Sequence, residues 1–158
     1  MFAASNSTGL VLTLPSNYLF VGLVGVGTFW VNLLQILQVS KYRKLSGIEY
    51  PQHMATQEQA KSSQAAMKFN CAQRIVNAAI GNAPTFLVGL FWTGLYAPNL
   101  AASLGGLYLV GRVLYTLGYI NAGPKGRLTK GGLLATFGYY PLMLIATYYA
   151  VKPLLALV

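Results

Sequence analysis

The sequence of 158 residues contains few acidic side chains, and this shortage excludes several kinds of enzyme chemistry. It has no aspartate and only two glutamates, Glu49 and Glu58, which lie in one polar segment. A Ser-His-Asp triad needs an aspartate, and glycoside hydrolysis needs a pair of carboxylates across the substrate. The composition therefore argues against both reaction types.

Cysteine and histidine are equally scarce, with one of each in the chain. Cys71 has no second cysteine with which to form an intrachain disulfide or a cysteine-based metal cluster. His53 and the two acids are too few and too scattered for the ligand set of a protein metal site. We therefore predict no bound metal.

Long apolar stretches dominate what is present. Charged residues make up only 8 % of the chain, against about a quarter in an ordinary soluble domain, and hydrophobic residues make up 55 %. Four stretches reach the length of about 18–20 residues that crosses the hydrocarbon of a bilayer, and they do not alternate in polarity as barrel strands do. The sequence predicts an all-α protein, a four-transmembrane-helix bundle forming a single domain over 1–158, with helices at about 18–39, 66–96, 101–120 and 131–151.

The net charge of +9 is unevenly distributed along the chain. Eight basic residues lie in the segments 40–68 and 121–130, whereas only Lys152 lies at the opposite side of the predicted bundle. Because positively charged loops face the cytosol, we predict that both segments are cytosolic and that both termini lie on the far side. Membrane topology thus accounts for the charge without a nucleic-acid partner, and the basic rim suits anionic lipid headgroups or an anionic substrate.

Arg112 stands inside the otherwise apolar stretch Ala101–Ile120. A permanent charge within a membrane helix usually faces a protein interior or a polar cavity. At helical spacing, Tyr108, Tyr115 and Tyr119 fall on the same face as Arg112. A guanidinium only donates hydrogen bonds and a phenol can donate one, so this face predicts an anionic ligand held between helices near one side of the membrane.

A second arginine, Arg74, lies near the cytosolic end of the second predicted helix and shares a face with Asn77. The predicted membrane segments contain no acid that could pair with Arg74 or Arg112. The remaining partners are helix carbonyls, water, or an external anion. A tripeptide with two carboxylates, such as glutathione, suits the last alternative.

Three amides, Asn32, Gln35 and Gln38, lie on roughly one face of the first predicted helix. Interhelical hydrogen bonding is the usual use of amides in membranes, and contact with a ligand is the alternative. The sequence leaves both interpretations open.

Three sequence motifs follow one another along the chain. The first is SKYRKLSGIEYP at Ser40–Pro51, and the second is FNCAQR at Phe69–Arg74, with Pro84 ten residues after the arginine. The third is VGRVLYTLGY at Val110–Tyr119, followed by Gly-Pro-Lys. These motifs are similar to those of the MAPEG family and, within it, to the branch of microsomal glutathione S-transferase type 3. They keep the family's order and spacing over residues 14–127, and the four-helix topology agrees with this resemblance.

The resemblance implies a homotrimer, with glutathione bound in a cleft between adjacent subunits near the cytosolic face. A basic residue after the third helix is thought in this family to stabilise the glutathione thiolate, and Arg127 is the candidate here. The candidate catalytic residues are therefore Arg127 and Tyr115, and the candidate glutathione-binding residues are Arg74, Asn77, Arg112, Tyr115 and Tyr119.

The second predicted helix departs from the family pattern at two positions that contact glutathione. The family has an asparagine and an acid after its arginine, at positions where this chain has Ala78 and Gly81. Asn77 comes one residue too early and Asn82 one residue too late to take these places. Losing the charged hydrogen bond of the acid costs about 1.5–3 kcal/mol, or roughly 10–150-fold in affinity.

Two functions follow, and the sequence does not choose between them. One is a membrane-bound glutathione S-transferase or glutathione-dependent lipid hydroperoxide peroxidase of the endoplasmic reticulum or the mitochondrial outer membrane. The alternative is a non-catalytic MAPEG-like scaffold, or an accessory subunit of a larger membrane complex, in contact with membrane lipids. A small channel or transporter is disfavoured, because the chain has no internal repeat and no acidic relay.

Overall fold

The computed structural model describes residues 14–126 and 131–155, and helices account for most of them. A short helix, α2, and one turn of 3-10 helix, η1, accompany the long helices. The long helices are α1 (Tyr18–Ser46), α3 (Gln64–Tyr96), α4 (Pro98–Ala122) and α6 (Gly132–Leu155), and the short elements are α2 (Gln57–Ser62) and η1 (Gly123–Lys125).

The four predicted membrane helices are confirmed as helices that are long and apolar enough to cross a bilayer. At about 1.5 Å per residue, even the 24 residues of α6, the shortest of the four, extend over about 36 Å, more than the roughly 30 Å of hydrocarbon. Together with their apolar composition, this length indicates an integral membrane protein.

The segment predicted as the first loop is shorter than expected. Helix α1 continues to Ser46 instead of ending near Val39, and it stops where Gly47 takes the left-handed conformation with φ of +66°. Basic residues in its last turn favour this extension, because they face the negative end of the helix dipole. At the other end of the loop, Ser63 caps α3, which therefore begins slightly before the predicted residue 66.

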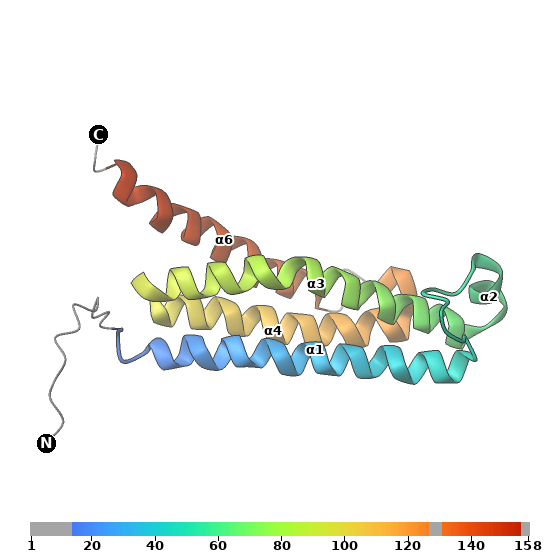
Figure 1. Cartoon of the computed structure of the whole chain (residues 1–158). Helices are drawn as coiled ribbons and strands as arrows, with labels where there is room; N and C mark the ends of the chain where they lie inside the picture. The colour runs from blue at the N-terminus through green and yellow to red at the C-terminus, as the bar shows by residue number, and fades with distance from the viewer. Residues whose placement is uncertain (1–13, 127–130, 156–158) are drawn as a thin grey trace, which may run out of the picture.

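The helices α1, α3 and α4 lie side by side along the bundle, whereas α6 is slanted and its C-terminal end stands away from them (Figure 1). In the described part of the chain, α6 packs against α3 and α4 and not against α1. Helix α2 and the end of α4 lie at one end of the bundle, and the start of α1 lies at the other. Both basic connections therefore leave the bundle at the same end.

Close packing of α6 on α4 depends on glycine. A Cβ added to Gly111 of α4 would overlap the backbone of Ala135, and one added to Gly138 of α6 would overlap the backbone of Tyr108. Small residues allow helix backbones to approach in this way in membranes, where no hydrophobic effect drives the helices together. This contact fixes the N-terminal half of α6 beside the part of α4 that carries Arg112.

Candidate functional site

Arg112 is the only arginine that the structure buries among the residues it describes, with 6 % of its surface exposed. Its Nη2 donates hydrogen bonds to the backbone carbonyl of Ile75, at 3.2 Å, and to Oε1 of Gln35, at 3.4 Å. The guanidinium of α4 is thus tied to both α3 and α1. One of the partners left open by the sequence, a helix carbonyl, is present.

The amide of Gln35 continues this network to Thr116. Its Nε2 donates to Oγ1 of Thr116 at 3.0 Å, and that hydroxyl donates to the carbonyl of Arg112 at 2.7 Å. Gln35 is 1 % exposed and Thr116 is fully buried. For Gln35, interhelical hydrogen bonding is therefore confirmed. Thr116 gave no signal in the sequence, because a threonine in a membrane helix usually bonds only within its own helix.

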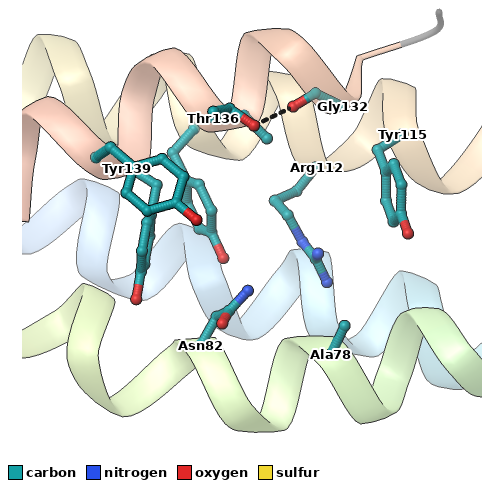
Figure 2. A pocket seen from close by; sticks show the side chains of 10 residues that line it. Ala78, Asn82, Arg112, Tyr115, Gly132, Thr136 and Tyr139 are labelled. Atoms are coloured by element: carbon teal, nitrogen blue, oxygen red, sulfur yellow. Dashed lines mark hydrogen bonds between the residues drawn. The ribbon is translucent and has the colours of Figure 1, made fainter. Parts of the chain in front are cut away.

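A cavity of about 250 Å³ opens beside Arg112, between α3, α4 and α6. The Arg112 side chain extends across this space toward α3, and Tyr139 projects into it from α6 (Figure 2). It is lined mainly by aromatic, small and hydroxyl-bearing side chains, namely Ala78, Asn82, Tyr108, Arg112, Tyr115, Gly132, Ala135, Thr136, Tyr139 and Tyr140.

Two candidate residues of α4 lie at this cavity. Besides Arg112, Tyr115 lines it, with its ring centroid 5.5 Å from the guanidinium carbon. Tyr119 is only 5 % exposed and packs in an apolar cluster with Cys71 and Ile75. The tyrosines of the predicted strip therefore have different surroundings, although all lie on one helix.

The candidates of α3 are placed differently. Arg74 and Asn77 are exposed on the surface of α3 and do not line the cavity. Ala78, at the position of the family asparagine, does line it, and so does Asn82 one turn further along. Gly81 faces open space, since a Cβ added there would meet nothing within 4 Å. The candidate Arg127 lies outside the described residues.

Helix α6 contributes cavity residues that the sequence analysis did not select as site candidates. Tyr139 and Tyr140 lie about two turns inside α6, and this position could have separated them from tyrosines of the membrane interface, which gather at helix ends. Thr136 uses its hydroxyl within α6, where it donates to the carbonyl of Gly132 at 2.9 Å. Nothing in the sequence distinguishes Thr136 from other membrane threonines.

A second, apolar cavity follows the first along the groove between α3 and α6. Its volume is about 550 Å³, and its lining includes Val88, Trp92 and Met143. The hydroxyl groups of Thr85 and Tyr139, 2.6 Å apart, form a hydrogen bond where the two cavities adjoin. The groove therefore offers a polar, cationic part and an apolar part in succession.

The histidine, cysteine and acidic side chains of the described residues are not gathered into one group. Within residues 14–126 and 131–155, no three histidine, cysteine or acidic side chains lie close enough to hold a metal ion. Glu49 lies in the loop that follows α1, and Glu58 lies in α2. Neither acid lines the cavity. The described residues that line the cavity offer one cation, four phenols, one aliphatic hydroxyl and one amide.

Comparison with known protein families matches residues 21–149 to the MAPEG family. The match covers about four fifths of the chain and includes most of each long helix. It also includes the three segments in which the sequence resembles this family, as well as Arg112 and the residues that line the cavity beside it. The chain therefore belongs to the MAPEG family, which includes glutathione transferases and related membrane proteins.

Proposed function

We propose that this protein is a glutathione S-transferase or glutathione-dependent lipid hydroperoxide peroxidase, similar to microsomal glutathione S-transferase type 3. The cavity beside Arg112 is the observation that carries the proposal. Family membership supports a glutathione-dependent activity in general, and the site residues support this particular ligand.

Arg112 is suited to hold a carboxylate of glutathione. The residues on either side of it in the sequence are apolar, and the described residues that line the cavity include no acid to neutralise it. Nη2 is engaged by Gln35 and Ile75, while Nε and Nη1 carry further N–H groups that can donate to an anion. A charge-assisted hydrogen bond is among the stronger interactions a ligand can make.

Tyr115 and Arg127 are the proposed groups for the reacting sulfur. A thiol attacks as its thiolate, and a phenol or guanidinium close to the sulfur stabilises that anion. Tyr115 lines the cavity next to Arg112, and its phenol is the proposed donor to the sulfur. Arg127 follows α4 in the chain and enters this proposal from the sequence resemblance alone.

A homotrimer would complete the site. Arg74 and Asn77 are exposed on α3, and polar groups facing lipid are costly unless protein covers them. MAPEG proteins are generally membrane trimers, so a neighbouring subunit is the proposed cover. The cavity of about 250 Å³ is also slightly below the roughly 300–1,000 Å³ of typical ligand sites, as expected if a second subunit encloses part of the ligand.

The alternative function is a non-catalytic lipid-binding scaffold or an accessory subunit. The observation that favours it is the uncharged surface of α3 at Ala78 and Gly81, which leaves the ammonium group of glutathione without an acid. The apolar cavity between α3 and α6 would suit a lipid chain in either function. Membrane lipids are proposed partners in both cases.

Glutathione titration of the purified protein in detergent separates the two functions. Calorimetry measures binding, and the ultraviolet absorbance of the thiolate reports whether the bound sulfur is ionised. An analogue with a methyl group in place of the thiol is the control, since it keeps both carboxylates. Binding of both ligands, together with thiolate formation by glutathione, supports the enzyme. An intact oligomer that binds neither ligand supports the scaffold.

We further propose that the segments 40–68 and 121–130 face the cytosol, in the endoplasmic reticulum or the mitochondrial outer membrane. Single cysteines at Ser46 and Ser5 test this orientation, since the native Cys71 is buried. A membrane-impermeant reagent on the cytosolic side should label Ser46→Cys and spare Ser5→Cys. The reverse pattern would show that the orientation is inverted.

A further inference from the structure

We propose that Gln35 and Thr116 are positioning residues, which hold the Arg112 guanidinium in the orientation that binds an anion in the cavity. The inference rests on the proposed function only for the identity of the anion, a carboxylate of glutathione. Its basis is a closed ring of hydrogen bonds that joins Gln35, Thr116 and Arg112 across α1 and α4.

The direction of every bond in this ring is fixed by chemistry. A guanidinium cannot accept a hydrogen bond, so the oxygen of the Gln35 amide must face Arg112. Its nitrogen then faces Thr116 and donates to that hydroxyl. The single hydroxyl proton of Thr116 is committed to the carbonyl of Arg112, so the ring has one consistent arrangement.

The ring holds Arg112 from the side opposite to the cavity. Gln35 belongs to α1, and no residue of α1 lines the space between α3, α4 and α6. Helix α1 also makes no contact with α6 in the described chain. Gln35 and Ile75 therefore fix Nη2, and the rest of the guanidinium is left at the cavity wall.

Without these hydrogen bonds, the Arg112 side chain could adopt a second conformation that points away from the cavity. Long cationic side chains in membrane helices extend toward the nearest polar interface, and Arg112 lies about 15 Å from the end of α4 at about 1.5 Å per residue. Ordering a flexible side chain when the ligand arrives would also reduce affinity. The ring performs that ordering during folding, so the ligand meets a preorganised cation.

Substitutions that break the ring without removing Arg112 test this role. Gln35→Leu removes both amide groups, and Thr116→Val removes the hydroxyl while keeping the shape of the side chain. Thr116→Ser keeps the hydroxyl and should rescue. Gln38→Leu is the matched control, because it removes a half-buried amide from the same helix outside the ring.

Calorimetric titration with glutathione gives the first readout. We expect Gln35→Leu and Thr116→Val each to raise the dissociation constant by about fivefold, within the range of one ordinary hydrogen bond, because neither variant removes the guanidinium itself. Thr116→Ser and Gln38→Leu should stay within about twofold of wild type. In an Arg112→Met background, Gln35→Leu should have no further effect, because it acts through Arg112. Unchanged affinity in Gln35→Leu and Thr116→Val, or a further loss in that background, would overturn the proposal.

Nuclear magnetic resonance of protein labelled with ¹⁵N-arginine gives a readout that needs no ligand. The Arg112 signal is identified by its loss in Arg112→Met. Its guanidinium protons should exchange with water at least several-fold faster in Thr116→Val than in wild type, and Thr116→Ser should restore slow exchange. If wild type does not bind glutathione, the proposed function fails, and this measurement still decides the positioning role. Equal exchange in all variants would contradict it.

Discussion

The two sides of α4 differ in how they are closed. Toward α1, buried Gln35 and Thr116 link the helices by hydrogen bonds, and the space near Arg112 on that side amounts to about 10 Å³. Toward α6, glycines bring the backbones into contact, yet cavities of about 250 and 550 Å³ remain between α6 and α3. The closed side sets the orientation of Arg112, and the open side offers room for a ligand.

This difference has a physical origin in the side chains at each contact. Glycine contacts allow the N-terminal half of α6 to pack closely on α4. Further along, α6 is slanted away from α3 (Figure 1). The α1 side has no comparable slant and fills its interior with large residues such as Phe86 and Leu90, packed with Val21 of α1. Close packing there leaves little volume for a ligand beside Arg112, and the larger space of about 400 Å³ between α1 and α4 lies at the far end of the bundle, near Asn99.

The largest expected effect comes from removing Arg112, which belongs to both sides. We expect Arg112→Leu to weaken glutathione binding by roughly 10–150-fold, because a charged hydrogen bond contributes about 1.5–3 kcal/mol. The apparent melting temperature should also fall, since the carbonyl of Ile75 and the amide of Gln35 lose a partner in a buried site. Calorimetry and thermal unfolding measure the two effects, and full affinity in a folded Arg112→Leu protein would place the ligand elsewhere.

The glycine contact of the open side can be broken with a single methyl group. Gly111→Ala should destabilise the protein by about 1–3 kcal/mol, because the new Cβ overlaps the backbone of Ala135 and forces α4 and α6 apart. Gly106→Ala makes the same change on the same helix, where nothing lies within 4 Å. Thermal unfolding in detergent should show a lower melting temperature only for Gly111→Ala. Equal values for the two variants would mean that the α4–α6 contact is looser than described.

The polarity of the open side can be increased at α3. The double change Ala78→Asn, Gly81→Glu should lower the glutathione dissociation constant by roughly tenfold or more, since the carboxylate would meet the ligand's ammonium group. A Cβ added at Gly81 meets nothing within 4 Å in the described chain, so the first atom of the new side chain has room.

The control for this change is Ala78→Asn, Gly81→Gln, which has the same shape without the charge and should gain much less affinity. Calorimetry decides between them, and gel filtration verifies that the oligomer is intact. An intact Glu variant with wild-type affinity would indicate that the cavity serves a ligand without an ammonium group, and would favour the scaffold.

The smallest expected effect concerns the hydrogen bond where the two cavities adjoin. Tyr139→Phe removes the hydroxyl that bonds Thr85, at a cost of about 0.5–1.5 kcal/mol in stability. The adjacent change Tyr140→Phe should leave the melting temperature nearly unchanged. Thermal unfolding of both variants measures the difference, and equal melting temperatures would show that the Thr85–Tyr139 bond contributes nothing measurable.

Much of the fold could be predicted from the sequence because membrane helices follow local rules. Apolar runs of sufficient length give the four helices, and a shortage of acids makes Arg112 conspicuous. The end of α1 was predicted too early, because polar residues after Val39 suggested a loop although nothing before Gly47 breaks a helix. Family motifs also predicted membership, which the match over residues 21–149 confirms.

The site was predictable only in part. Helical periodicity put Arg112 and Tyr115 on one face of α4, and both line the cavity. The same periodicity grouped Tyr119 with them, although Tyr119 packs in the apolar cluster with Cys71. Asn82 and Tyr139 line the cavity from other helices, and no pattern within one helix could bring them to Arg112.

The sequence by itself determined that this chain has four membrane-spanning helices, that it resembles the MAPEG family, and that Arg112 needs a partner inside the membrane. Only the tertiary structure decided that Gln35 and the carbonyl of Ile75 are such partners, and that the cavity opens toward α6. The reason is that a repeat of 3.6 residues assigns side chains to the faces of a helix, whereas the packing of neighbouring helices decides which face is covered and which stays open.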